Sequence, residues 1–291
     1  MDQAVDFRPS SELRGGEYHS KVNRSQPSGG GPATGTRAAR DLTPCARVNR
    51  LATPDPRMDT LPDAVAQQRT STALRLSGVA APRRAGTPGL ENLDLELAQG
   101  DFLLVHGDAG AGKSLLMGLA GLSLKPAAGR VEVLGLNPWR ISASGRSRLR
   151  RRLGLVFQDL DLIDDMTVFE NAALPLRIAG ARPEAYKKDV AELLDWIGLG
   201  QKAGARPQDL DHDQRQRLAV ARAVAARPEI ILADEPVGWM GPEAAGRVLR
   251  LLLQLNRQGV TLVLASRNPD LAPASRRLEL VGGRALPERR T

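Results

Sequence analysis

The sequence predicts an α/β fold with a largely parallel β-sheet. Apolar runs of strand length alternate with amphipathic stretches of helical period over residues 73–288. One run, Phe102–Val105, stops directly before a glycine-rich loop, as buried parallel strands do. Another, Ile230–Ala233, ends in two adjacent carboxylates, Asp234 and Glu235. Because ligands bind at the carboxyl ends of parallel strands, we expect the loop and the carboxylates to share one site.

Composition limits what the chain can be. Its 291 residues are 42% hydrophobic, which is enough for the core of one domain of about 200 residues, with chain left over. The single cysteine, Cys45, excludes an internal disulfide framework and a thiolate metal site. No apolar run approaches the roughly 20 residues that span a bilayer, and the N-terminus lacks the apolar region of a signal peptide. We expect membrane association only through a partner protein.

The chain is basic, with a net charge of +8 and a pI near 10.3. Such an excess suits nucleic acid or an anionic membrane surface. Aromatic residues make up only 3% and no nucleic-acid-binding motif is present, so we expect no nucleic-acid partner. Five arginines crowd into residues 146–152. They form either a solvated helix end, which is the more common case, or a surface that faces lipid headgroups.

Residues 1–72 differ in composition from the rest. They are rich in Pro, Gly, Ser, Thr and Arg and show no sustained period of strand or helix. This pattern predicts a disordered extension ahead of a domain at 73–288. The alternative is that translation starts at Met58, which lies closer to the first strand-like segment near Ala73–Leu76.

The elements of the domain follow from local pattern. Val131–Val133 alternates apolar and polar residues, while Leu153–Phe157 and Val260–Ala265 are continuous apolar strands. Pro183–Ile197 has mostly helical spacing and is followed by glycines that end a helix. Leu278–Leu286 reads as two short strands around a Gly-Gly turn.

The glycine-rich segment Gly107–Ser114 fits the phosphate-loop pattern G-x-x-x-x-G-K-[ST], between a strand and the helical run Leu115–Ala120. Its glycines let backbone N–H groups curl around a β-phosphate, and the helix N-terminus faces the same anion. We expect Lys113 to reach the β- and γ-phosphates and the Ser114 hydroxyl to coordinate Mg²⁺. The predicted nucleotide-binding residues are Gly107, Asp108, Ala109, Gly110, Ala111, Gly112, Lys113, Ser114 and Leu115.

The paired carboxylates complete this chemistry. Asp234 is expected to hold the water shell of the metal ion. Glu235, on the other face of the strand, is expected to accept a proton from the water that attacks the γ-phosphate. Adjacent carboxylates alone are a weak signal, whereas together with the phosphate loop they strongly predict a nucleotide site.

Four segments, Gly107–Ser114, Val156–Asp159, Gln214–Ala223 and Ala233–Pro236, occur in the order and approximate spacing of the ATP-binding domains of ABC transporters. Residues 73–288 resemble that family. The resemblance implies an α/β P-loop NTPase of the ABC type, with a mixed β-sheet core, a small antiparallel β-subdomain and a helical subdomain near residues 160–212. It also implies ATP and Mg²⁺ as cofactors. Gln158 then corresponds to the glutamine that contacts Mg²⁺ and the attacking water; the alternative is a polar residue at the end of a strand.

Within that family the chain is most similar to the cell-division ATPases of the FtsE type, through Phe169–Arg177, Leu199 and Leu255–Gly259. The LolD-type lipoprotein-release ATPases are near relatives. The resemblance implies a homodimer that sandwiches ATP between one subunit's phosphate loop and the other's signature motif. It also implies docking on an integral-membrane permease like FtsX, at the cytoplasmic face of the inner (plasma) membrane.

The chain departs from its family at the signature motif. The family sequence Leu-Ser-Gly-Gly-Gln/Glu aligns with Leu210, Asp211, His212, Asp213 and Gln214. Two carboxylates replace groups that approach the γ-phosphate of the partner's ATP, and we expect them to repel it.

The histidine that senses the γ-phosphate in the family is here Arg267. Arginine cannot shuttle a proton near neutral pH, but it can donate hydrogen bonds to a γ-phosphate; the alternative is an arginine that faces solvent. Val237–Gly241 has glycine where the family has aspartate, and no aromatic residue between Tyr18 and Phe102 is available to stack on adenine.

The retained motifs bind triphosphate and metal, whereas the altered ones complete the dimer. We therefore expect ATP binding to survive better than hydrolysis, with Glu235, Gln158 and Arg267 as catalytic residues and Ser114, Gln158 and Asp234 around the metal ion. Three functions stay open. They are an FtsE–FtsX-like ATPase in cell division, a divergent ATP-binding scaffold with little or no turnover, and the ATPase subunit of a lipoprotein-release or export transporter.

Overall fold

The structure, a computed structural model, describes residues 72–82, 89–274, 276–286 and 289–290. The chain divides into two units, Met1–Leu42 and Thr43–Thr291, and every described residue belongs to the second. The predicted extension at 1–72, except Thr72, and the alternative start at Met58 lie outside the described residues. No helix in the described ranges is long and apolar enough to cross a membrane.

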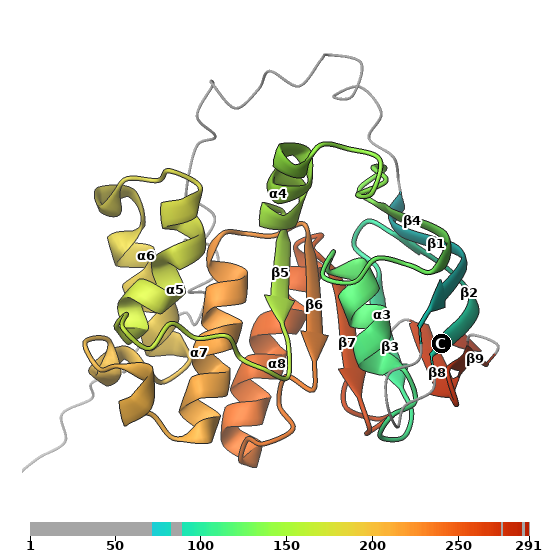
Figure 1. The fold of residues 1–291 in the computed structure, drawn as a ribbon. Helices are drawn as coiled ribbons and strands as arrows, with labels where there is room; N and C mark the ends of the chain where they lie inside the picture. The colour runs from blue at the N-terminus through green and yellow to red at the C-terminus, as the bar shows by residue number, and fades with distance from the viewer. Residues whose placement is uncertain (1–71, 83–88, 275, 287–288, 291) are drawn as a thin grey trace, which may run out of the picture. The chain divides into compact units, whose positions relative to one another are not determined.

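A mixed β-sheet forms the centre of the domain (Figure 1). The strands run in the order β10-β8-β3-β7-β6-β5, and the short β9 pairs with β8. Strands β8, β3, β7, β6 and β5 pair in parallel, whereas β9 and β10 run antiparallel to β8. Their bounds are β3 Phe102–His106, β5 Leu153–Val156, β6 Ile230–Asp234, β7 Thr261–Ser266, β8 Arg276–Val281, β9 Arg284–Ala285 and β10 Arg289–Arg290.

A second, antiparallel sheet has the order β2-β1-β4, with β1 at Thr72–Ala81, β2 at Leu90–Ala98 and β4 at Ala128–Val133. The strand expected near Ala73–Leu76 is longer than its apolar pattern, because β1 continues past Gly78 through a register shift. Strand β2 is not among the elements predicted from sequence. Its leucines alternate with polar residues and bury one face of the strand, as expected for a half-buried antiparallel strand.

The described residues form six α-helices, which accompany the sheets (Figure 1). The helix expected at Pro183–Ile197 is α6; it ends at Trp196, and Gly198 follows with φ of 76°, a backbone angle that glycine adopts without strain. Thr167 begins α5 with a capping box to Glu170. The helices are α3 Lys113–Ala120, α4 Ala143–Arg151, α5 Val168–Ile178, α6 Pro183–Trp196, α7 His212–Ala225 and α8 Pro242–Arg257, with 3₁₀ turns at Gly200–Lys202 and Pro207–Asp209.

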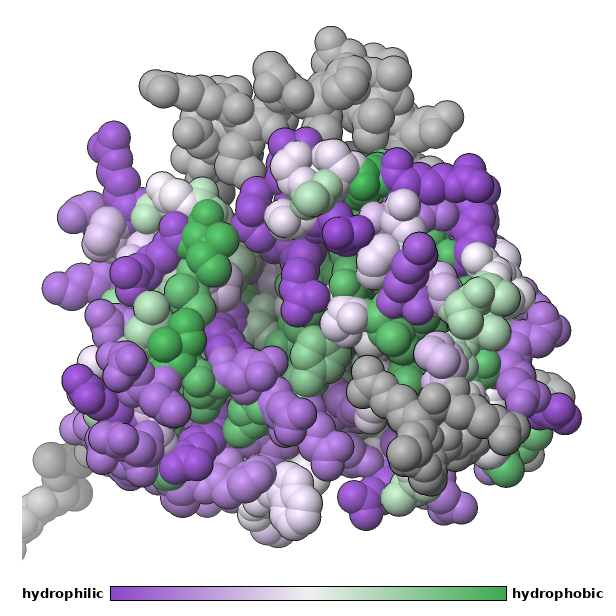
Figure 2. All heavy atoms as spheres, in the orientation of Figure 1, coloured by the Kyte–Doolittle hydropathy of each residue, from purple (hydrophilic) through white to green (hydrophobic). Residues whose placement is uncertain are grey.

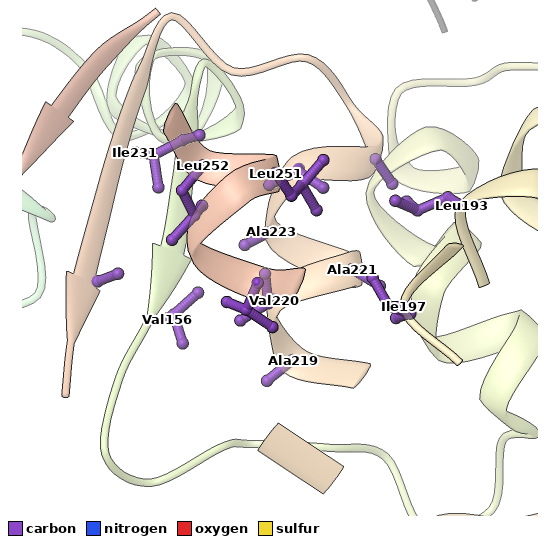
Figure 3. Packing of buried hydrophobic residues seen from close by; sticks show 14 of the residues in the cluster. Val156, Leu193, Ile197, Ala219, Val220, Ala221, Ala223, Ile231, Leu251 and Leu252 are labelled. Carbon is purple, nitrogen blue, oxygen red and sulfur yellow. The ribbon is translucent and has the colours of Figure 1, made fainter. Parts of the chain in front are cut away.

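The parallel sheet separates two hydrophobic clusters. Leu103 and Val105 of β3 pack in the cluster that includes α3 and the antiparallel sheet, whereas Phe102 and Leu104 pack with α5 to α8. Figure 3 shows α7 between the sheet residues Val156 and Ile231 on one side and, on the other, Leu193 of α6 and Ile197, which directly follows α6. Small residues let a helix approach its neighbours closely, and the α7 residues Ala219, Ala221 and Ala223 are all buried there. Helices α5 and α6 therefore share one hydrophobic core with the sheet.

The strand order brings the predicted site residues together. Strand β7 lies between β3 and β6, with His106 opposite Ser266 and Asp234 opposite Ala265. Because the three strands are parallel, their carboxyl ends meet at one edge. The phosphate loop after β3, the carboxylates at the end of β6 and Arg267 after β7 therefore follow three strand ends at the same edge.

Because α6 and the sheet share one core, we expect a substitution in α6 to destabilise the whole domain. Leu194 of α6 is fully buried in the cluster that also holds sheet residues, whereas Ile178 of α5 is 59% exposed. We expect Leu194→Ala to lower the free energy of unfolding by about 2–5 kcal/mol in a single transition that includes the sheet. The matched control, Ile178→Ala, should cost less than about 1 kcal/mol. Chemical denaturation followed by circular dichroism measures both, and separate unfolding of the helical part would contradict the shared core.

Candidate nucleotide-binding site

The loop between β3 and α3 is built on glycines that no other residue replaces easily. Gly107, Gly110 and Gly112 have φ angles of 148°, 78° and 107°, which L-residues rarely adopt. A Cβ atom at Gly107 would lie 2.2 Å from the backbone oxygen of Leu280, and one at Gly112 would lie 2.8 Å from Cδ2 of Leu90. Backbone conformation and close packing together fix the course of the loop.

Two segments distant in sequence hold this loop in place. The backbone N–H of Gly283, in the turn between β8 and β9, donates a hydrogen bond to the Ala111 oxygen at 3.1 Å, and Glu91 of β2 donates to the Gly283 oxygen at 3.0 Å. The C-terminal turn therefore supports the phosphate loop from behind. The turn is predicted from sequence as part of a hairpin, whereas its contact with the loop is not.

Lys113, the first residue of α3, closes the loop. Its side chain is buried, and Nζ donates to the backbone oxygens of Gly107 at 2.7 Å and Asp108 at 2.9 Å. An ammonium group has three donors, so one remains for a phosphate oxygen. No side chain caps the N-terminus of α3 at Gly112, which leaves the first backbone N–H groups of the helix available to an anion. Loop, lysine and helix end together form a phosphate cradle.

Asp234 lies beside this cradle at the end of β6. The residue is only 4% exposed, and burial raises the pKa of its carboxyl group, partly offset by a hydrogen bond from the Ser114 hydroxyl and by the charge of Lys113. The Ser114–Asp234 pair offers a hydroxyl and a carboxylate oxygen, the hard ligands that Mg²⁺ prefers. A desolvated carboxylate is stabilised by a bound cation, so these residues fit a magnesium ion.

The remaining ligands of such an ion would not come from a protein cage. Among the described residues, no group of three or more His, Cys, Asp or Glu side chains gathers as a metal site. Magnesium in nucleotide sites needs only one or two protein ligands, because phosphates and water supply the rest. The third predicted metal residue, Gln158, is exposed just after β5. The structure shows no hydrogen bond from it to Ser114 or Asp234 in the described part of the chain.

Glu235 sits in an unusual backbone conformation. Its φ angle is 49°, which costs a non-glycine residue about 1–3 kcal/mol and persists only where the surroundings fix it. Here the Glu235 N–H donates to the Ala265 oxygen at 2.9 Å, and the Gln216 side chain of α7 donates to the Glu235 oxygen at 2.6 Å. The backbone N–H of Glu235 is thus anchored to β7, and its backbone carbonyl oxygen is anchored to α7.

The Glu235 carboxylate meets Arg267 and Ser266. Arg267 Nε lies 3.7 Å from Oε1, and the Ser266 hydroxyl lies 3.5 Å from Oε2. The Oε1 atom is buried without a hydrogen bond among the described residues. Arg267 is still 64% exposed at its side chain, so it faces solvent and contacts the carboxylate at once. This contact is not predicted from sequence, since the two residues are 32 positions apart and only the pairing of β6 with β7 brings them together.

The altered signature segment forms the start of α7. Asp211 is the N-cap residue: its carboxylate accepts the Gln214 N–H at 2.8 Å, and the Gln214 side chain accepts the Asp211 N–H at 3.3 Å. Aspartate is among the best N-cap residues. Its own carboxylate therefore occupies the anion-binding end of α7. Leu210, just before it, is buried.

The other two substituted positions also have local partners. Asp213 forms an ion pair with the buried Arg217 at 2.8 Å, and Arg217 donates to the Ile197 oxygen at 2.8 Å. The His212 ring lies 5.7 Å from the ring of Trp239. Trp239 lies in the segment after β6 and is 63% exposed. The signature segment and the segment Val237–Gly241 therefore touch each other within one chain.

Comparison with known proteins identifies the family. The family described as ABC transporter matches residues 90–238. The chain is 38% identical to the lipoprotein-releasing system ATP-binding protein LolD 1 of Rhodopseudomonas palustris, over 68% of this chain and 91% of that protein. It is 33% identical to the cell division ATP-binding protein FtsE of Mycobacterium tuberculosis, over 70% and 90%.

Two further matches define how far the likeness extends. The methionine import ATP-binding protein MetN of Carboxydothermus hydrogenoformans is 38% identical over 63% of this chain, and the match spans about half, 55%, of that longer protein. Among solved structures, the dimeric post-hydrolysis state of the ATP-binding cassette MJ0796, bound to ADP and Pi, superposes with a TM-score of 0.70 at 30% identity. It covers 75% of this chain and 98% of the cassette. The chain therefore belongs to the ABC transporter family, as an ATP-binding domain with an α/β fold.

Proposed function

We propose that this chain is the Mg·ATP-binding subunit of a membrane complex of the FtsE–FtsX type, and that it hydrolyses ATP slowly. The observation that carries the proposal is the phosphate cradle, in which the buried Lys113 closes a glycine loop beside the Ser114–Asp234 pair. These groups match the charge of a triphosphate and its metal ion.

In the proposed reaction, the loop N–H groups and Lys113 hold the β- and γ-phosphates, while Ser114 and Asp234 hold Mg²⁺. The metal ion neutralises charge on the phosphate oxygens when it is bound. Glu235 accepts the proton of the attacking water, whose oxygen bonds to the γ-phosphorus as the bond to the bridging oxygen of ADP breaks. Arg267 and Ser266 hold the Glu235 carboxylate in position. Gln158 is proposed to contribute to the metal and water site from the end of β5.

The proposed partners follow from the relatives. The ATP-binding cassette MJ0796 has a dimeric structure, and we propose that two copies of this chain dimerise in the same manner beneath an FtsX-like permease. The proposed location is the cytoplasmic face of the inner membrane. Slow turnover is proposed because Asp211 places a carboxylate at the α7 N-terminus, where a dimer of this type would bring the partner's γ-phosphate.

A lipoprotein-release role is the second candidate, favoured by the 38% identity over 91% of LolD 1. Both functions use the same nucleotide chemistry, so a cellular test separates them. Depletion of the chain should give filamentous, undivided cells if it acts in division. Lipoproteins retained in the inner membrane, with normal division, would support the second candidate instead.

The role of Glu235 is tested by Glu235→Gln. We expect phosphate release to fall by at least about 100-fold, because a general base contributes that much or more. Binding of fluorescent ATP should stay within about threefold of wild type, since the cradle is intact. Steady-state phosphate release and fluorescence anisotropy measure the two quantities. If both proteins release phosphate equally slowly, the chain is an ATP-binding scaffold rather than an ATPase.

Because Asp234 is buried, we expect its replacement to change two properties in opposite directions: the stability of the nucleotide-free protein and its stabilisation by Mg²⁺ and ATP. Its folded-state pKa is raised, so the free protein loses stability as pH rises from the unfolded-state pKa through the folded one. We expect Asp234→Asn to raise the melting temperature of the nucleotide-free protein at pH 7, by removing a buried charge. The same change should reduce the further stabilisation by Mg²⁺ and ATP, because it removes one of the two side chains proposed to hold the metal ion. Differential scanning fluorimetry checks both; a lower melting temperature without nucleotide would contradict the argument.

The charge at the signature position is tested by Asp211→Asn. Asparagine caps a helix as well as aspartate does, so the free energy of unfolding should change by less than about 0.5 kcal/mol. Removal of the charge should raise phosphate release at least about threefold, a barrier change of about 0.7 kcal/mol. Asp165→Asn, at an exposed position after β5, is the matched control for charge. Equal effects of the two substitutions would show that Asp211 does not limit turnover.

A further inference from the structure

Positive charge is concentrated on one short segment of the domain. Residues 133–158 contain six arginines and no acidic residue, whereas the rest of the chain from residue 73 onward contains 25 basic and 25 acidic residues. The segment includes α4 and the residues on either side of it. The arginines are Arg140, Arg146, Arg148, Arg150, Arg151 and Arg152.

Only some of these arginines contact other groups of the domain. Arg152 pairs with Glu229 through two hydrogen bonds, one of them 2.8 Å long, and Arg150 donates to the Gly121 oxygen at 3.2 Å. The guanidinium of Arg146 lies 5.1 Å from the ring centre of Trp139, a cation–π distance. Glu229 is thus the one carboxylate seen paired with these arginines in the part of the chain that the structure describes.

Two of the arginines point to a role beyond the fold. Arg148 and Arg151 are exposed and lie three positions apart on α4, and their side chains form no hydrogen bond or ion pair with the described residues. Residues at this spacing share one side of a helix. Arginines near the C-terminus of a helix also interact favourably with the helix dipole. That interaction does not account for six arginines in a segment that contains no acidic residue.

The surface of α4 lacks an apolar anchor. Only Leu149 is buried among its nine residues, and serines and arginines make up most of the remainder. The large exposed hydrophobic side chains of the described residues all lie elsewhere: Ile163, Ile178, Trp239, Val281 and Leu286. In Figure 2 the surface at the place of α4 is mostly hydrophilic or intermediate in colour. At protein interfaces, arginine hot spots occur together with Trp and Tyr anchors in well-packed, desolvated pockets, whereas a layer of phosphate groups needs only charge.

We propose that α4 is a contact surface for the anionic headgroups of a membrane. Arg148 and Arg151, with Arg140 nearby in the sequence, donate hydrogen bonds to lipid phosphate oxygens, which arginine matches well through its planar donors. The contact is additional to any permease and does not depend on which permease that is. Helix α4 leads into the N-terminal end of β5, whereas the nucleotide residues follow the carboxyl ends of the parallel strands (Figure 1). The two sites therefore lie at opposite ends of the sheet, and both can be occupied at once.

The experiment uses the full chain and vesicles of defined composition. Flotation is compared on vesicles of equal parts phosphatidylglycerol and phosphatidylcholine and on vesicles of phosphatidylcholine alone. The test variant is Arg148→Gln with Arg151→Gln, which breaks no contact of the fold. The matched control is Arg250→Gln with Arg257→Gln, which removes the same charge from exposed positions of α8. Binding of fluorescent ATP is measured on every preparation, so that a failure of the nucleotide site is told apart from a failure of lipid binding.

We expect wild type and the α8 control to bind the anionic vesicles, and the α4 variant to bind at least about fivefold more weakly, because each basic residue near the surface contributes separately. Binding should weaken steeply with salt and be small on phosphatidylcholine. Equal binding by the two double variants would overturn the proposal, as would equal binding to both kinds of vesicle. If a single-stranded RNA oligonucleotide bound through α4 while anionic vesicles did not, the surface would serve nucleic acid and the lipid proposal would be wrong.

Discussion

Burial of two opposite charges, those of Lys113 and Asp234, at the carboxyl edge of the parallel strands is the constraint on which the site depends. Neither group is stable in a protein interior without partners. Lys113 is satisfied by carbonyl oxygens of its own loop, which in turn requires glycine conformations along that loop. Asp234 keeps a raised pKa even with Ser114 and Lys113 beside it. The Asp234 carboxylate thus lacks a full positive counter-charge, while the loop offers hydrogen-bond donors to an anion. A metal ion that carries an anionic ligand would suit both.

Helix α7 links this site to the helical part of the domain. Its small buried residues let the sheet and α6 pack on either side of it (Figure 3), while Gln216 holds the backbone oxygen of Glu235. Its first residues belong to the altered signature segment, where Asp211 caps the helix. The substitution suits folding, because a carboxylate stabilises a helix N-terminus. It suits phosphate binding poorly, because the carboxylate takes the place that an external anion would occupy.

Some site residues were within reach of sequence reasoning and others were not. Ser114 and Asp234 were predicted to share the metal ion, and their side chains are hydrogen-bonded in the fold. Glu235 was identified by its place after an apolar strand, but its contacts with Gln216, Ser266 and Arg267 were not. Local pattern reports strand ends and loops. It does not report which strands and helices become neighbours: Ser266 and Arg267 reach Glu235 because β7 pairs with β6, and Gln216 reaches it from α7.

The sequence by itself determined the α/β class, the phosphate loop, the paired carboxylates and the family, because each depends on residue types at fixed local spacing. Only the tertiary structure decided that strand β2 exists, that the Gly283 turn supports the loop, and that Arg267 meets Glu235. It also decided that Asp211 serves its own helix and that Arg148 and Arg151 remain unpaired by the described residues. These features depend on which distant segments pack together, and packing is decided by the burial of the whole core rather than by any short stretch of the chain.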